Sequence, residues 1–338
     1  MERPVIDAHI HFGAPADEQS GCYWSEEFEH TAAYYVMLFL THSLFRKINI
    51  ARMQKHLLNV INSAKLVSHS IVLALDEVYD EQGNKHPEMT HLYVPNSYLI
   101  DLKKTNPRIL LGASVHPHRQ DWQDELDYCI ENGAVLCKWI PSSQQIKPDH
   151  PTCMPFYKKL AQTGLPLLAH AGPEYAIPTS DKNYDIYNNP KYLRRALDEG
   201  VTVILAHCAM PYFGFLDVDY HDDFEDFLKL FKEAEHNGWN LYADLSAIAT
   251  PLRAPYVEKV KQEISEHRLL FGSDYPIPAS ELSYNKVKGF FSWIKYVFRV
   301  WTTRNPLDKN YKIIRKMKFG KKVFTNGNRL FNITSAPG

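Results

Sequence analysis

Two histidines lie two residues apart near the start of the chain, at the end of an apolar stretch. Residues 5–11 read Val-Ile-Asp-Ala-His-Ile-His. Alternate side chains of a β-strand point to the same face, so His9 and His11 would project together, roughly 6–7 Å apart along the strand. Two imidazoles at that spacing can bind one metal ion. Such pairs also occur by chance, so the prediction depends on whether residues further along the chain could join them.

Four further polar residues each end a short apolar run of the kind expected for a buried strand. The runs cover residues 134–138, 166–170, 201–207 and 268–274, and they end in Lys138, His170, His207 and Asp274. Taken singly, each residue has an ordinary structural explanation, such as a hydrogen-bonded buried histidine or a helix-capping aspartate. Because they recur at equivalent strand ends, we predict that they meet in one site.

Apolar runs and helical patterns alternate along the chain. With the first strand, the runs at 70–76, 109–115 and 240–244 bring the expected strands to eight, and helices are expected over 31–47, 50–66, 96–105, 124–131, 154–163, 191–199, 222–236 and 255–266. This alternation predicts an α/β fold of the (β/α)8, or TIM-barrel, type. An open doubly wound sheet would place a glycine-rich phosphate-binding turn after the first strand, and this sequence has none there.

We therefore predict a single domain over residues 1–338, with a barrel core at about 3–276. The pattern adds a helical insertion after the first strand and a C-terminal helical extension over 277–338. The extension is basic, with twelve lysines and arginines between 286 and 322 against one acid, Asp308. Residues 287–301 form an amphipathic helical pattern, which could bind an outside surface. We favour a helix packed on the barrel with its basic face in solvent.

Barrel enzymes bind substrates with the loops that come after the strands. The candidates on those loops are His116, Arg119, Trp139, Glu174 and Arg253. Either arginine could hold a carboxylate through two hydrogen bonds, although a surface ion pair would explain it equally well. Asp7 lies on the same strand face as His9 but deeper, so we expect it to support a ligand without being one.

The composition excludes several classes of function. The chain has 338 residues, 45% of them hydrophobic and 23% charged, with a net charge of −1. This balance gives no reason to expect a nucleic acid partner, and no apolar run is long enough to span a bilayer. Five cysteines without a C-x-x-C pair and the lack of a secretory signal pattern predict a cytoplasmic protein with reduced thiols. We expect a small-molecule substrate, and the sequence leaves open whether the protein forms a homo-oligomer.

Five segments carry a resemblance to a known family. They are residues 6–11 (Ile-Asp-Ala-His-Ile-His), 166–172 (Pro-Leu-Leu-Ala-His-Ala-Gly), 204–209 (Ile-Leu-Ala-His-Cys-Ala), 270–276 (Leu-Phe-Gly-Ser-Asp-Tyr-Pro) and 327–331 (Gly-Asn-Arg-Leu-Phe). In this order they resemble the amidohydrolase superfamily of metal-dependent hydrolases. The resemblance is to its amidohydrolase-related branch (Amidohydro_2), which also contains aminocarboxymuconate-semialdehyde decarboxylase-like and resorcylate-type decarboxylases. The motifs are specific for the branch and not for a substrate.

The resemblance implies that His9, His11, His170 and Asp274 bind one divalent metal ion, with zinc expected and manganese as the alternative. Three imidazoles and a carboxylate suit such an ion and leave a position for water, whose pKa falls towards ~7. Asp274 would take the proton of that water. His207 would orient the water or stabilise charge that develops on the substrate.

Lys138 leaves the number of metal ions open. In binuclear members of the superfamily, a carboxylated lysine on this strand bridges two metals, and the histidines at the positions of His170 and His207 bind the second. The branch resembled here typically has one metal ion, and we favour one.

The resemblance leads to three candidate functions. The leading prediction is a hydrolase that uses an activated water to cleave a small-molecule amide, lactone or related carbonyl derivative. The alternative is a non-oxidative decarboxylase of an aromatic or enoic acid. The third is a non-catalytic binding scaffold, which would have no need for an intact set of ligands.

Overall fold

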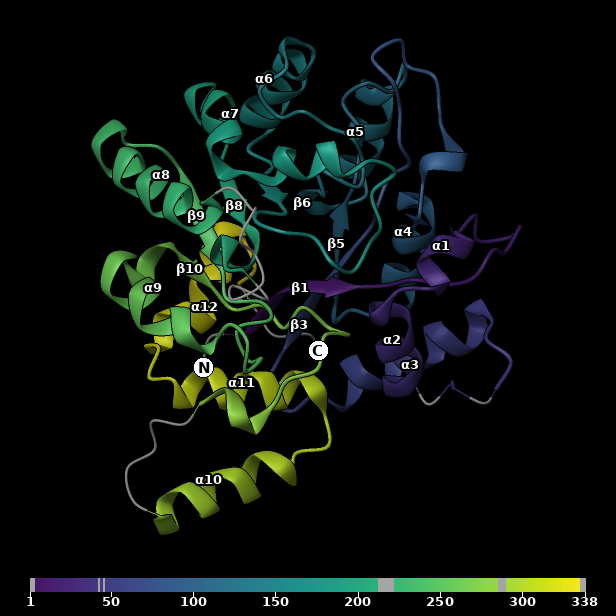
Figure 1. Cartoon of the computed structure of the whole chain (residues 1–338). Helices are drawn as coiled ribbons and strands as arrows, with labels where there is room; N and C mark the ends of the chain where they lie inside the picture. Colours follow the sequence, from purple (N-terminus) through teal and green to yellow (C-terminus); the bar gives the residue numbers. More distant parts are fainter. Residues whose placement is uncertain (1–3, 42, 45, 212–221, 285–289, 335–338) are drawn as a thin grey trace.

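Eight parallel strands form a barrel at the centre of the computed structural model (Figure 1). The structure describes residues 4–41, 43–44, 46–211, 222–284 and 290–334. In sheet order the strands are β1 (Ile6–His11), β3 (His69–Leu73), β5 (Ile109–Ala113), β6 (Ala134–Trp139), β7 (Leu167–Ala169), β8 (Val203–Leu205), β9 (Leu241–Asp244) and β10 (Leu269–Leu270). Each strand pairs in parallel with the next. The predicted TIM barrel is confirmed.

Backbone hydrogen bonds between the segments at β1 and β10 close the barrel. They have lengths of 2.8–2.9 Å and run from the N–H groups of Ala8, His11 and Asp274 to the carbonyls of Phe271, Tyr275 and His9. Asp7 adds a side-chain bond, since its buried Oδ1 accepts from the Ser273 N–H at 2.8 Å. Residues from the two ends of the barrel sequence are thereby held next to each other.

Helices surround the strands. They are α1 (Glu26–Glu29), α2 (Ala32–Leu40), α3 (Ile50–Ser63), α4 (Asn96–Thr105), α5 (Trp122–Glu131), α6 (Met154–Thr163), α7 (Arg194–Asp198), α8 (Asp223–Asn237), α9 (Val257–Glu263), α10 (Phe290–Trp301), α11 (Pro306–Lys316) and α12 (Lys321–Leu330). The predicted helices 96–105 and 154–163 have the observed bounds. The helix predicted over 31–47 is shorter, because the Thr41 hydroxyl bonds to the Met37 carbonyl and the chain turns away there. Residues 42 and 45 of that prediction lie outside the described residues.

The insertion after β1 contains α1 to α3 and one strand of a small antiparallel sheet. In this sheet β2 (Tyr23–Trp24) pairs with β4 (Leu92–Tyr93), a pairing that the sequence pattern did not predict. Strands this short are fixed by their partner and not by their own pattern. The small sheet ties the insertion to the segment that comes after β3.

The C-terminal extension joins the barrel through α11 and α12. The Asp308 carboxylate on α11 accepts from the Lys65 and Leu66 N–H groups at 2.8–3.0 Å, just beyond the end of α3. Helix α10 lies furthest from the strands (Figure 1) and buries Tyr296 and Val300, while Lys295 and Arg299 are exposed. Among the described helices, none is long and apolar enough to cross a membrane.

Candidate metal centre

Three predicted site residues bring their donor atoms together at the end of the barrel. His9 Nε2 lies 3.0 Å from His11 Nε2, and Asp274 Oδ1 lies 3.5 Å and 3.3 Å from these two nitrogens. Adjacent ligands of a tetrahedral ion with bonds of ~2.0–2.1 Å stand roughly 3.3–3.4 Å apart. The three distances fit that spacing, and two imidazole nitrogens facing each other this closely are well suited to sharing a cation.

The backbone places these donors through the barrel closure. The Asp274 N–H donates to the His9 carbonyl, so the residue on the loop after β10 lies directly beside β1. Asp274 has a left-handed φ of 60°, as does His207 with a φ of 56°. Such a conformation is rare for residues other than glycine and often marks functional positions. Gly272 permits the approach, because a Cβ there would stand 3.1 Å from the His9 Cβ.

Asp244, at the end of β9, orients His9 from behind. Its Oδ2 lies 2.8 Å from His9 Nδ1, and both side chains are fully buried. The other oxygen accepts from the His207 and Ser246 N–H groups at 2.9 Å and 3.0 Å. A carboxylate on Nδ1 keeps the proton there and leaves Nε2 free to bind a metal. Asp244 was not among the predicted site residues, although it stands at a strand end as Asp274 does.

His207 and His170 lie beside the three donors. His207 Nδ1 stands 2.7 Å from Ser246 Oγ and 3.5 Å from Asp274 Oδ2, and its Nε2 stands 3.3 Å from His170 Nδ1. His170 Nδ1 also pairs with Glu174 Oε2 at 3.2 Å. His170 is therefore next to the group formed by His9, His11 and Asp274 without being part of it.

Lys138 is completely surrounded by the barrel, and its Nζ lies 3.4 Å from His9 Nε2. Burial lowers the pKa of this amine to about 8, although the nearby carboxylates of Asp244, Asp274 and Glu174 act to raise it. From its position on β6, the lysine side chain thus extends to the three donor atoms.

Burial and mutual charge set the protonation of the site. Burial lowers the pKa of His170 to about 4 and holds that of His9 and His207 below the usual range. Burial would raise the pKa of Asp274, but its interactions with His207, His9 and His11 outweigh that effect and hold the pKa well below its usual range. Neutral imidazoles and an ionised carboxylate are the forms that bind a metal.

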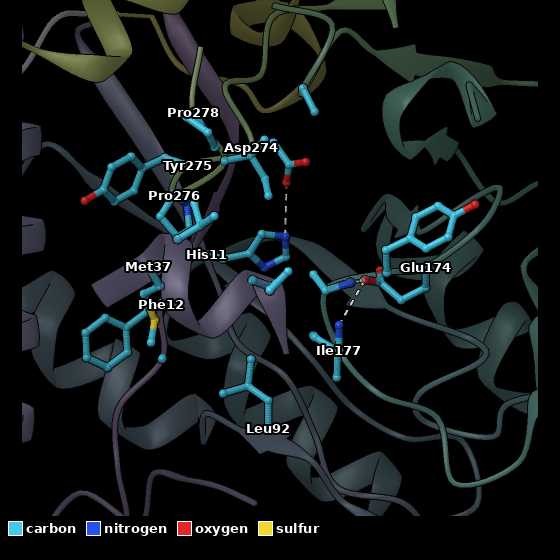
Figure 2. Close-up of a pocket in the computed structure, with 18 of the residues that line it drawn as sticks. His11, Phe12, Met37, Leu92, Glu174, Ile177, Asp274, Tyr275, Pro276 and Pro278 are labelled. Carbon is cyan, nitrogen blue, oxygen red and sulfur yellow. Dashed lines mark hydrogen bonds and ion pairs between the residues drawn. The ribbon is translucent and has the colours of Figure 1, made fainter. Parts of the chain in front are cut away.

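A cavity of about 280 Å³ opens over these groups. Figure 2 shows His11 and Asp274 pointing toward each other at its edge, with Glu174 on one side and Phe12, Met37 and Leu92 gathered on another. Two predicted substrate-side residues, Glu174 and Arg253, line the cavity. The Glu174 carboxylate accepts from the Ala176 and Ile177 N–H groups, and Arg253 is buried.

The other three predicted substrate-side residues are not among the described residues that line this cavity. His116 is buried and its Nε2 donates to the Gln144 carbonyl at 2.9 Å. Arg119 forms ion pairs with Asp76 and Asp121. Trp139 is buried in the core, where its Nε1–H donates to the Val115 carbonyl. Each side chain thus supports the barrel, because strong internal partners hold it away from the cavity.

Comparisons with solved structures agree with this fold. A probable 2-pyrone-4,6-dicarboxylic acid hydrolase from Acinetobacter baumannii is 14% identical, with a TM-score of 0.56 over 97% of this chain and 99% of its own. A 2,6-dihydroxybenzoate decarboxylase is 16% identical, with a TM-score of 0.55 over 98% and 100%. The 5-carboxyvanillate decarboxylase of Sphingomonas paucimobilis is 13% identical, with a TM-score of 0.50 over 98% and 100%. At these identities the likeness shows the fold alone.

Sequence comparison identifies the family. A search of curated protein sequences returned no significant match. The family model Amidohydro_2, described as amidohydrolase, matches residues 72–299, which is more than half of the chain. With the barrel and its cluster of histidines and carboxylates, this match shows that the chain belongs to the amidohydrolase family of enzymes.

Proposed function

We propose that this protein is a metal-dependent hydrolase that cleaves an amide, a lactone or a related carbonyl derivative of a small molecule. The observation that carries the proposal is the convergence of His9 Nε2, His11 Nε2 and Asp274 Oδ1 at the spacing of metal ligands, beside a cavity of substrate size. Membership of an enzyme family supports a catalytic role and argues against a non-catalytic binding scaffold.

The donor set suits zinc, with manganese as the alternative, and we propose His170 as the fourth ligand. We propose one ion. A second group of His9, His207 and Asp244 also brings ligand atoms together, but His9 and Asp244 already bond to each other there. The Lys138 amine at 3.4 Å from His9 Nε2 is close enough to act as an uncarboxylated cation beside the site. The binuclear alternative, with a carboxylated Lys138 and His207 as ligands, would require both side chains to give up these contacts.

A divalent ion held here would lower the pKa of water towards ~7 and polarise a substrate carbonyl. The Asp274 carboxylate accepts the proton of the attacking water at Oδ2, the oxygen that faces His207. The His207 imidazole stabilises the charge on the substrate oxygen, and Ser246 fixes its orientation through Nδ1. Glu174 and Arg253 contact the rest of the substrate from the cavity wall.

Non-oxidative decarboxylation is the second candidate. Two structural relatives are described as decarboxylases, and Arg253 in the cavity wall could hold a carboxylate. The same residues would then serve an aromatic or enoic acid, with release of carbon dioxide in place of hydrolysis.

We also propose that residues 1–338 form one domain and that the protein works in the cytoplasm, where its five buried free cysteines would stay reduced.

The test is elemental analysis and turnover of purified protein grown with zinc or manganese, beside His9→Ala and Asp274→Ala. We expect about one ion per chain in the wild type, little in either variant, and turnover of one class in a panel of esters, lactones, amides and carboxylic acids. Carbon dioxide release without hydrolysis would select the decarboxylase. Wild-type protein without stoichiometric metal would remove the basis of both, and about two ions per chain with activation by carbonate would establish the binuclear site.

A further inference from the structure

Two helices of the insertion cover the cavity with apolar side chains. From α2, Ala32, Ala33, Val36 and Met37 line it, at the spacing of one helix face. From α3, Met53 and Leu57 line it one turn apart, together with His56. The insertion after β1 is therefore a lid whose inner face is mainly apolar, with Thr41 and His56 as polar side chains on it.

Further apolar residues line the cavity outside the two helices. They come from β4 and from loops in separate parts of the chain: Phe12, Leu92, Ile140, Ile177 and Ile277. Figure 2 shows that Phe12, Met37 and Leu92 stand on the side of His11 away from Asp274 and Glu174. The cavity thus has a polar end at the candidate metal ligands and an apolar end beneath the lid.

Charged residues are few in this lining. Within the described residues, Asp274 and Glu174 are its acids and Arg253 is its one arginine or lysine. Arg253 interacts electrostatically with His170 and His207, so it lies at the polar end of the cavity. A second carboxylate at the far end of a ligand would have to be buried against hydrocarbon without a partner, which is strongly unfavourable. The lining therefore favours a ligand with a single polar group.

We propose that the substrate is amphipathic, with one carbonyl or carboxylate group at the metal end and an uncharged aliphatic or aromatic body under α2 and α3. This inference rests on the proposed function for the polar end, and on the lining alone for the apolar end. The cavity of about 280 Å³ is close to the lower limit of small-molecule sites, ~300 Å³. It therefore suits a short alkyl chain or a single ring.

The test is calorimetric titration of the zinc-loaded full chain with two series of probes, linear monocarboxylates from butanoate to octanoate and the dicarboxylates of the same lengths. We expect the affinity of the monocarboxylates to rise about fourfold for each methylene until the cavity is full. The heat-capacity change of binding should be negative, as for burial of apolar surface. The dicarboxylates should bind at least about tenfold more weakly.

Neighbouring residues of α2 provide matched variants. Val36 lines the cavity, whereas Tyr35 points outward and is 54% exposed. Val36→Asp should weaken hexanoate binding by about tenfold or more, and Tyr35→Asp should change it less than about twofold. If Val36→Asp does not fold, Val36→Thr keeps the side-chain shape and should still weaken binding. Ala33→Leu should instead shift the optimum to a shorter chain.

Two results would overturn the inference: dicarboxylates that bind as tightly as monocarboxylates, or an affinity independent of chain length, in protein shown to hold its metal. Failure of the proposed function is a different observation, because protein without metal or turnover could still bind monocarboxylates in order of chain length.

Discussion

His9 Nδ1 and Asp244 Oδ2 lie 2.8 Å apart, both fully buried, on the side of the imidazole opposite His11. The contact joins the end of β9 to β1 across the inside of the barrel, and it fixes which nitrogen of His9 carries the proton. The pKa of Asp244 is held below its usual range, because its contact with His9 and the hydrogen bonds from Ser246 and the His207 N–H outweigh the effect of burial.

Replacing Asp244 with asparagine should weaken metal binding about 10-fold to 100-fold while the fold survives. An amide can turn its NH₂ toward His9 Nδ1, which would move the imidazole proton to Nε2 and block the ligand position. Competition with a chromophoric chelator measures the affinity. Asp223→Asn, a buried aspartate on α8, is the control and should leave the affinity unchanged.

Replacing His207 with asparagine should separate catalysis from metal binding. The side chain stands beside Asp274 and Ser246 and outside the group formed by His9, His11 and Asp274. We expect metal content to stay near that of the wild type and kcat to fall about 10²-fold to 10³-fold. A variant that loses both its metal and its activity would make His207 a ligand and favour the binuclear site.

His116 should make the protein less stable in acid. Burial lowers its pKa to about 3, and the charges of His118 and Arg119 act in the same direction. The unfolded chain binds this proton near pH 6.5, so the stabilising contribution is complete above pH 6.5 and is lost as the pH falls towards 3. The slope from this residue is about 1.4 kcal/mol per pH unit within that window.

His116→Asn should therefore flatten the acid side of a plot of unfolding free energy against pH, measured with urea at several pH values. The variant can keep an acceptor for the His118 N–H, which bonds to His116 Nδ1 at 3.1 Å, but it loses the donor to Gln144. An unchanged slope would mean that His116 is accessible to protons in the folded state.

Gly272→Ala should displace residues of the candidate metal site by crowding the backbone and side chains next to them. The added methyl group would stand 3.1 Å from the Cβ atoms of both His9 and Ser246. Because neighbouring strands must move to accept it, we expect a loss of about 1–3 kcal/mol in stability together with weaker metal binding. Gly238→Ala is the matched comparison, since Gly238 has a φ of +69° and open space around it. That variant should lose stability through backbone strain and keep its metal affinity.

The sequence predicted the barrel and most of the site because both depend on local patterns. The strands alternate with helices at regular intervals, and His9, His11, His207 and Asp274 stand at strand ends, where the fold makes side chains converge. The ranges of α4 and α6 were correct because their apolar spacing ends at strong local stop signals.

The contacts that determine the role of each site residue form only in the folded protein, between segments far apart in the sequence. Asp244 ends a strand as Asp274 does, but only the packed barrel shows that one faces His9 Nδ1 and the other His9 Nε2. His116 and Arg119 come after β5, and Trp139 ends β6, all on the expected side of the barrel, yet each side chain has an internal hydrogen-bond or ion-pair partner. The lid could not be predicted for the same reason, because a helical pattern near residue 32 does not reveal which face of the helix meets the cavity.

The hydrogen bonds between β1 and β10 also set an order of events during synthesis. His9 and His11 belong to the first strand of the barrel to be synthesised, whereas Asp274 and the strand before it come after all the other strands of the barrel. While the strands between them are being synthesised, a nascent chain therefore holds the two imidazoles without the carboxylate that completes the group. The full set of donors can exist only when the last strand has docked against the first, so a loaded metal site would report that the barrel has closed.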